Sequence, residues 1–106
     1  MKEIKAIIQP FVLDKVIDAL EVIPGLPGIT ISDVRGFGKA GDGNDPVRDV
    51  KKVKLEIMVP ESMAKEVVDR IAKAAHTGNP GDGKIFVIDI EDVVKIRTGE
   101  RGRDAI

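Results

Sequence analysis

The sequence has 106 residues, of which 42% are hydrophobic and 33% charged, which is typical of one globular domain with its own core. A net charge of −1 and the absence of Trp and Tyr argue against a nucleic-acid-binding protein, which needs a basic surface and aromatic side chains that stack on bases. The absence of Cys excludes disulfides, thiolate metal sites and cysteine nucleophiles, and it fits a cytoplasmic location. No apolar run reaches the roughly 18 residues of a membrane span, so we expect no insertion into a membrane.

The first third of the chain shows the periodicity of a strand, a helix and a second strand. Residues 2–9 alternate between apolar and polar, which predicts a strand that ends at Pro10. Residues 29–37 predict a second strand, and its alternation slips between Ile31 and Val34, so we expect a bulge there. Between the two strands, apolar residues recur at the spacing of a helix with one buried face: Leu13, Val16, Ile17 and Leu20.

The remainder repeats this order after an irregular stretch. Residues 39–50 are rich in Gly and Asp and lack periodicity, which predicts a mobile surface loop. Residues 51–60 alternate clearly and predict a strand, and residues 84–90 and 93–97 predict two more extended segments before a loosely held polar tail. A second helix is predicted after Pro60, with this apolar face: Met63, Val67, Val68, Ile71, Ala72 and Ala75.

The order β-α-β, loop, β-α-β predicts an α+β fold of the ferredoxin-like kind, in which an antiparallel sheet carries two helices on one face. We interpret the three Phe residues as core residues: Phe11, Phe37 and Phe86. On the uncovered face, the third strand carries a mixed set of side chains: Lys52, Lys54, Glu56 and Met58. A half-polar face of this kind often packs against copies of itself, so we expect an oligomer.

Residues 77–84 combine three Gly and a Pro, which excludes regular structure there. Gly81 and Gly83 can adopt positive φ, so the backbone can turn tightly and its N–H groups can form an anion-binding concavity with Lys84 at the edge. This is a candidate phosphate cradle. It is not a Walker A loop, because Lys84 leads into a strand rather than a helix, and a simple turn is the alternative interpretation.

Other polar residues offer weaker signals. Lys95 and Arg97 would share one face of an extended segment and could clamp a phosphate, or they could form a solvated basic edge. His76 follows the second predicted helix, where a capping role is favoured over catalysis or metal binding. The acidic residues of the 39–50 loop fit no calcium-loop pattern: Asp42, Asp45 and Asp49. One His without Cys provides no ordinary transition-metal site.

Five stretches together closely resemble the P-II signal-transduction (nitrogen regulatory) family, and the resemblance covers nearly the whole chain. They are residues 1–11, 33–38, 53–60, the glycine-rich residues 77–87 and the tail at 95–100. The resemblance implies a homotrimer of ferredoxin-like subunits of one domain each, here residues 1–106. It also implies a T-loop at about 39–51, a glycine-rich B-loop at 77–84 and a C-terminal segment at 95–106.

The same resemblance implies that adenine nucleotides (ATP, ADP or AMP) bind in the clefts between neighbouring subunits. When the family motif is matched to this chain, four residues would surround the phosphates: Gly81, Asp82, Gly83 and Lys84. Six others would line the nucleotide cleft: Ile7, Thr30, Gly36, Gly38, Lys39 and Met58. Lys95 and Arg97 would reach the phosphates from the neighbouring subunit. Most members carry Arg at the position of Lys95, so a bidentate contact becomes a point-charge contact.

Two departures from the family, and one position that agrees with it, bear on function. The T-loop is several residues shorter than in well-known members and contains no Tyr, so uridylylation of a tyrosine is excluded. Ala40 replaces a glutamine that helps hold Mg²⁺ and 2-oxoglutarate, and alanine offers no ligand atom. Lys52 matches the lysine that contacts 2-oxoglutarate and remains a candidate contact for a small effector. We therefore do not expect 2-oxoglutarate sensing of the usual kind, and Mg²⁺ binding stays open.

The resemblance is to a divergent P-II-like branch whose members are often linked to membrane transport, including heavy-metal efflux. It implies a non-enzymatic regulator that binds adenine nucleotides and controls a protein partner, such as a membrane transporter, through its mobile loop. The alternative is a slow ATPase or an acylphosphatase-like hydrolase on the same fold, with Asp82 and Glu56 as its obvious carboxylates. A trimeric scaffold with a vestigial cleft is a third interpretation.

Overall fold

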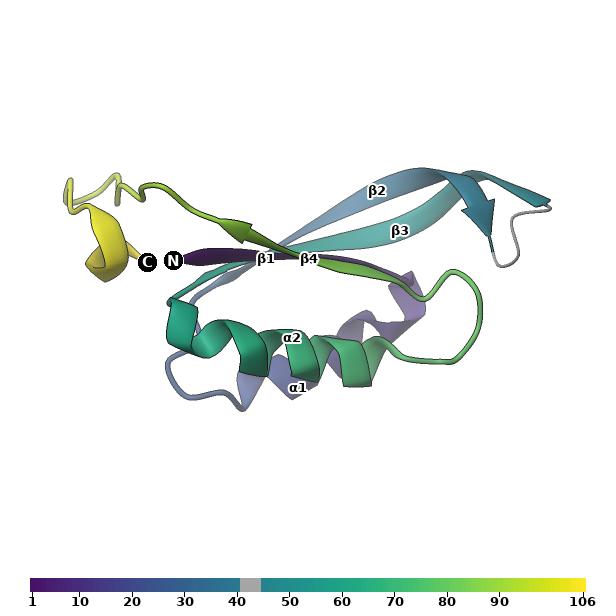
Figure 1. Ribbon diagram of the computed structural model, residues 1–106, viewed down its shortest axis with the longest axis horizontal. Coiled ribbons are helices and arrows are strands. Elements are labelled where there is room, and N and C mark those ends of the chain that lie inside the picture. Colours follow the sequence, from purple (N-terminus) through teal and green to yellow (C-terminus); the bar gives the residue numbers. More distant parts are fainter. Residues whose placement is uncertain (41–44) are drawn as a thin grey trace.

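Two helices pack against one face of a four-stranded antiparallel sheet (Figure 1). The structure is a computed structural model that describes residues 1–40 and 45–106, with side chains described for residues 1–38 and 49–106. The strand order is β2-β3-β1-β4. The elements are β1 (Lys2–Ile8), η1 (Pro10–Val12), α1 (Leu13–Glu21), β2 (Ile29–Ala40), β3 (Asp45–Val59), α2 (Glu61–Ala75), β4 (Gly83–Asp89) and η2 (Gly102–Ala105). This is the predicted ferredoxin-like α+β fold.

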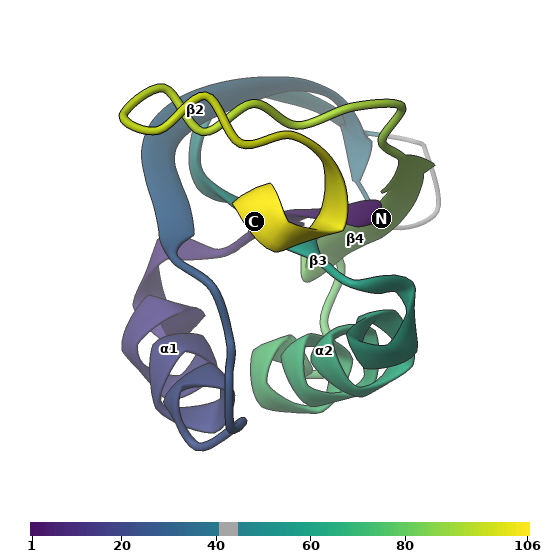
Figure 2. The same cartoon turned by 90° about the vertical axis from the view of Figure 1, so that its left-hand side faces the viewer.

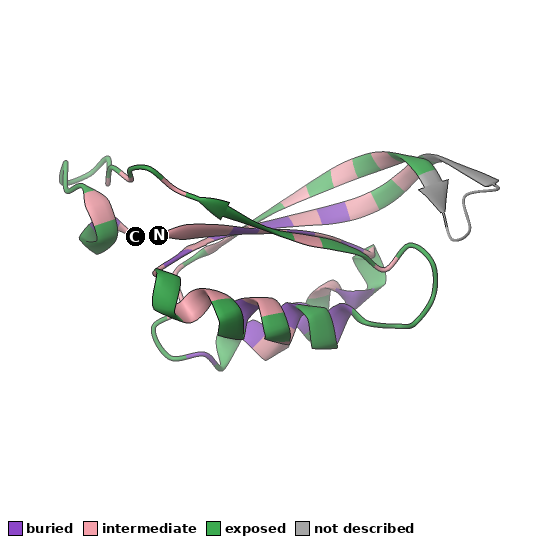
Figure 3. Cartoon of the chain, viewed as in Figure 1, coloured by how far each residue is buried: buried purple, intermediate pink, exposed green. Residues whose placement is uncertain are grey.

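The core lies between the sheet and the helix pair. Figure 2 shows α1 and α2 side by side beneath the sheet, and Figure 3 shows that both helices and the strands of the sheet contain buried residues. Because neighbouring strand residues point to opposite faces, every second residue is buried from Ile4 to Ile8 in β1 and from Val53 to Val59 in β3: Ile4, Ala6, Ile8, Val53, Leu55, Ile57 and Val59. Burying each large aliphatic side chain contributes about 1.5–3 kcal/mol.

Both predicted helices are present, and most of their predicted apolar positions are buried or half-buried, but Ala72 of the predicted α2 face is exposed and Ala74, which was not predicted, is buried. In α1 the spacing of Val16 and Leu20 places both side chains in the core. In α2, Val67, Ile71 and Ala75 are buried at four-residue intervals, as expected for one face of a helix. Pro60 is the residue before the first helical turn, where a missing N–H costs nothing.

The prediction of an irregular loop over residues 39–50 is wrong where the structure describes it. The β2–β3 ladder continues to the pairs Lys39↔Pro46 and Ala40↔Asp45, beyond a register shift between Gly36 and Gly38. Pairing with a neighbouring strand therefore outweighs the unfavourable local composition. The predicted bulge exists, but it lies at this Gly pair rather than between residues 31 and 34. The part of the prediction on residues 41–44, including Asp42, lies outside the described residues.

The C-terminal segment is a tight turn rather than the predicted extended piece. Val94 and Arg101 form an isolated bridge, the Lys95 N–H donates to the Glu100 carbonyl at 2.8 Å, and the Gly99 N–H donates to the Lys95 carbonyl at 2.7 Å. The last residues form η2, whose Ala105 is buried. The segment lies at the same end of the sheet as the chain's N-terminus, away from the α2–β4 connection (Figure 1).

The interpretation of the three Phe residues as core residues is also wrong for a single chain. Phe11 is 75% exposed, Phe37 is 71% exposed and Phe86 is 47% exposed. Phe86 lies on the sheet face away from the helices, where its partner across β1 is Lys5. Among the described residues, no helix combines the length and apolar character that crossing a membrane requires.

Candidate functional site

The turn that joins α2 to β4 has a backbone that only glycine fits at its last position. Gly78, Gly81 and Gly83 have φ of +88°, +93° and +103°, in the region that residues with a Cβ rarely adopt. A Cβ on Gly83 would lie 1.8 Å from the Ile7 carbonyl oxygen. The glycine therefore lets the turn approach β1 closely at the point where β4 begins.

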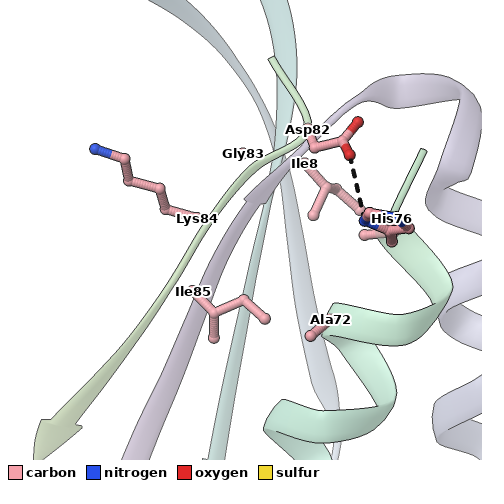
Figure 4. A pocket seen from close by; sticks show the side chains of 8 residues that line it. Ile8, Ala72, His76, Asp82, Gly83, Lys84 and Ile85 are labelled. Carbon is pink, nitrogen blue, oxygen red and sulfur yellow. Dashed lines mark ion pairs between the residues drawn. The ribbon is translucent and has the colours of Figure 1, made fainter. Parts of the chain in front are cut away.

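Asp82 holds this turn together from the inside. Its carboxylate accepts hydrogen bonds from the Thr77 N–H at 2.8 Å and the Gly78 N–H at 2.9 Å, and a short one from the Thr77 hydroxyl. The His76 Nδ1 lies 3.9 Å from an Asp82 oxygen (Figure 4). The hydrogen bonds from Thr77, foremost its hydroxyl, lower the pKa of Asp82. Asp82 thus shapes the backbone of the turn, which sequence reasoning did not anticipate.

This contact predicts a pH-dependent loss of stability in acid. Because the pKa of Asp82 is lower in the folded than in the unfolded chain, its ionised form stabilises the fold above the unfolded pKa of about 3.9, and that contribution disappears as the pH falls through the folded pKa. We expect Asp82→Asn to lower the melting temperature at pH 7 and to match the original chain at the acid end of a pH series. Asp18→Asn on the exposed side of α1 is the control. A deficit of constant size down to about pH 2 would contradict this role.

Lys84 points away from the core side of β4. Figure 4 shows its side chain directed to one side of the strand, while Ile8, Ile85 and Ala72 line a pocket on the other side, next to α2. That pocket has a volume of about 250 Å³ and is lined by both apolar residues and polar ones, among them His76 and Asp82. Lys84 is exposed and lies opposite Ile7, so its ammonium group is available on the uncovered face of the sheet.

Lys52 connects the glycine turn to β3. Its Nζ donates a hydrogen bond to the Gly81 carbonyl oxygen at 2.5 Å. A Cβ on Gly81 would lie 2.9 Å from Nε2 of Gln9, and a Cβ on Gly36 would lie 3.9 Å from Cγ of Lys52. Side chains or backbone from β1, β2, β3 and the turn therefore meet at this end of the sheet. Their convergence depends on strand pairing, which the sequence pattern alone did not reveal.

The backbones of three further predicted site residues lie at the end of the sheet that carries the glycine turn. Ile7 is paired with Lys84, Gly38 is paired with Val47, and Lys39 is paired with Pro46. The Lys39 side chain lies outside the described residues.

The other predicted residues lie elsewhere in the chain. Met58 is six residues along β3 from Lys52, which corresponds to about 20 Å of extended strand. Thr30 is opposite Glu56, also away from the turn. Lys95 and Arg97 belong to the C-terminal segment, at the opposite end of the sheet from the glycine turn (Figure 1). One chain alone therefore does not gather the whole predicted set around the turn.

The remaining polar candidates have structural partners. His76 occupies the C-cap position of α2, as predicted, and its side chain is 72% exposed beside Asp82. Glu56 is on the uncovered face of the sheet, where its carboxylate lies 3.5 Å from Nζ of Lys54. The two carboxylates considered for hydrolysis thus have different surroundings. Across residues 1–40 and 45–106, no cluster of His, Asp and Glu has the composition and proximity of a metal site.

Comparison with known proteins identifies the family of this chain. The family described as Nitrogen regulatory protein P-II matches residues 1–100. Proteins named Nitrogen regulatory protein P-II from Azospirillum brasilense, Rhodospirillum rubrum and Synechocystis sp. are each 45% identical to the chain, with all of both chains covered. Their alignments run over 113 positions against 106 residues here, so this chain lacks several positions that those relatives have. The chain belongs to the P-II family of nitrogen regulatory signal-transduction proteins.

Proposed function

We propose that the protein is a non-enzymatic cytoplasmic regulator that binds ATP, ADP or AMP in clefts between the subunits of a homotrimer. The observation that carries this proposal is the glycine turn, which places a closely approaching backbone beside Lys84 and Lys52. Two ammonium groups next to a Gly-rich backbone suit a polyphosphate, because N–H groups and cations both favour negative charge. Membership of the P-II family supports the same role.

Each residue has a specific part in this binding. Gly83 permits the close approach of the backbone, and Lys84 supplies a point charge on the open side of β4. Asp82 does not contact the anionic phosphates in this proposal. It keeps the turn in shape through Thr77 and Gly78. Lys52, which holds the Gly81 carbonyl, would transfer its hydrogen bond to a bound phosphate or small anion.

A second subunit would complete the cleft. Thr30, Met58, Lys95 and Arg97 lie too far along the sheet from the turn to join the other residues within one chain. In a closed ring of identical subunits, the end of one sheet meets a different part of its neighbour, so these residues could face the neighbour's glycine turn. The exposed side chains of Phe86 and Ile88 on the uncovered sheet face support such an assembly.

The signal would leave the cleft through the far end of the paired strands β2 and β3, where Lys39 is opposite Pro46. Lys52 lies in β3 six residues after Pro46 and holds the glycine turn, so a nucleotide that rearranges the turn would also displace β3. We propose that a protein target reads this change, and that the target is a membrane transporter, an efflux system or its regulator. Ala40 provides no ligand for Mg²⁺, so 2-oxoglutarate is not part of this proposal.

Calorimetric titration with ATP, ADP and AMP tests the proposal. We expect saturable binding of at least one adenine nucleotide below about 1 mM, which corresponds to more than about 4 kcal/mol of binding free energy. GTP is the matched control for the base. No heat and no competition by any adenine nucleotide at that concentration would contradict the proposal. Steady hydrolysis of ATP that disappears in Asp82→Asn and in Glu56→Gln would favour the hydrolase alternative instead.

A further inference from the structure

A groove between α1 and α2 is lined by three cationic side chains. It has a volume of about 340 Å³, and the described residues that line it are Lys15, Ala19, Arg70, Lys73 and Ala74, with no carboxylate among them. Ala74 is buried and Ala19 is half-buried, whereas Lys15 and Lys73 are exposed. The groove, which we call the basic groove, therefore combines a floor of small apolar residues with positive charges beside it.

Arg70 joins the two helices across the basic groove. Its Nη1 donates to the Ala19 carbonyl oxygen at 3.5 Å, and its Nε donates to Glu66 at 3.1 Å. Ala19 is in the last turn of α1, where the helix carbonyl groups favour a cation. These contacts hold the planar guanidinium group in one orientation, so it would lose little conformational freedom on pairing with a carboxylate.

The two lysines place a charge on each helix that borders the groove. Among the residues that the structure describes, neither the Lys15 nor the Lys73 ammonium group has a carboxylate oxygen within 4.0 Å. The neighbouring Asp69 on α2 pairs instead with Lys65, at 2.7 Å. A single exposed Lys is ordinary, but here two of them and Arg70 line one pocket from two different helices.

Helical spacing separates the acidic residues of α1 from the basic groove. Asp14, Asp18 and Glu21 recur at four- and three-residue intervals and share one face of the helix, whereas Lys15 and Ala19 share a face about 100° further around it. The whole chain has a net charge of −1. The positive charge of the groove is therefore a local feature, and the protein as a whole does not attract anions through its net charge.

We propose that the basic groove docks an acidic segment of a partner protein, whose Asp or Glu side chains pair with Lys15, Arg70 and Lys73. A basic segment would meet like charges at all three positions, whereas an acidic one is complementary throughout. The volume is at the lower end of the range of about 300–1,000 Å³ for ligand pockets, so it admits a few side chains rather than a folded domain.

The position of the groove leaves the proposed phosphate site accessible. The groove lies between the helices, whereas Lys84 is on the sheet face that the helices do not cover. Lys73 is in the last turn of α2, four residues before Thr77, whose N–H donates to Asp82 in the glycine turn. A partner in the groove would thus contact the helix that leads into this turn. The inference requires neither nucleotide binding nor the trimer.

An NMR titration of the ¹⁵N-labelled full chain with an oligoglutamate peptide tests the inference. We expect saturable shifts of the Ala19 and Ala74 amide signals below about 1 mM peptide, and no such shifts with an oligolysine peptide. Shifts confined to the glycine turn, or equal shifts with both peptides, would overturn the inference. Inorganic phosphate is the third probe. Saturation of the same signals at a lower concentration of phosphate than of peptide would also overturn it, because the groove would then bind small anions.

Charge reversal locates the peptide on the groove. We expect Lys15→Glu with Lys73→Glu to weaken peptide binding by about tenfold or more, since two attractive pairs become repulsive. The control, Lys51→Glu with Arg103→Glu, changes the net charge equally at two exposed positions on β3 and η2 and should leave the affinity unchanged. Equal losses in the two variants would show general electrostatic attraction and overturn the inference.

A milder variant covers the case in which the charge reversal unfolds a helix. Lys15→Gln with Lys73→Gln removes both charges and keeps side chains that are compatible with a helix. We expect a loss of affinity of about threefold to tenfold, because an exposed ion pair contributes little by itself. Thermal unfolding checks that this variant is folded. An unaltered affinity of the folded variant would overturn the inference, whatever the outcome of the nucleotide titrations.

Discussion

Replacing Gly83 by Ala is expected to destabilise the fold by about 3 kcal/mol or more, or to displace the glycine turn from β1. The residue has φ of +103°, and an added Cβ would meet the Ile7 carbonyl oxygen at 1.8 Å. Both the backbone conformation and the contact with Ile7 oppose a side chain. Urea unfolding of the original chain and the variant measures the difference.

Gly25 is the matched control for this change. It also has positive φ, +73°, but a Cβ there would meet nothing within 4 Å. Gly25→Ala should therefore cost only about 1 kcal/mol, from backbone strain alone. Equal effects of the two substitutions would show that the close approach of Gly83 to β1 is unimportant.

Replacing Lys84 by Ala is expected to weaken binding of ATP by about 10- to 100-fold, since a hydrogen bond to a charged group contributes about 1.5–3 kcal/mol. The side chain is exposed and points away from Ile85 and Ala72 beside α2, so its removal should leave the fold intact (Figure 4). Equilibrium titration measures the affinity, and thermal unfolding confirms the stability of the variant.

Lys73→Ala provides the control for charge. It removes an exposed Lys from α2, on the helical side of the sheet. A general electrostatic attraction for nucleotides would make the two variants weaken binding alike, whereas a site at the glycine turn predicts that only Lys84→Ala does so. Unchanged affinity in Lys84→Ala would place the nucleotide elsewhere.

The elements with strong periodicity could be predicted from the sequence. The alternation of Val53, Leu55 and Ile57 predicted β3, one of the two inner strands, and the spacing of Val16 and Leu20 predicted the buried face of α1. These patterns are informative because a strand or helix that is buried on one side carries apolar residues at regular intervals along the sequence. The resemblance to the P-II family could likewise be read from the glycine-rich motif and its surroundings.

Features that depend on residues distant in sequence could not be predicted in this way. The extension of β2 and β3 into the Gly- and Asp-rich stretch results from pairing between the strands, which overrides local composition. Phe86 looks like a core residue by type, yet it lies on the face that one chain leaves open. The hydrogen bond from Lys52 to Gly81 joins residues 29 positions apart, so it could not be predicted from the pattern of neighbouring residues.

The structure also changes how one predicted site residue is understood. The family motif places Asp82 among the residues around the phosphates, but its carboxylate is occupied by Thr77 and Gly78. We therefore assign it to the shape of the turn. The motif identifies the position, and the hydrogen bonds show how the side chain is used there.

Native mass spectrometry of the original chain with ATP tests the central claim most directly, because it counts subunits and nucleotides in the same particle. The proposed function predicts a trimer that acquires up to three nucleotides, one for each cleft between subunits, as the ATP concentration rises. A monomer that binds one nucleotide would contradict the shared cleft. A trimer that binds no adenine nucleotide would contradict the assignment of the glycine turn as a phosphate site.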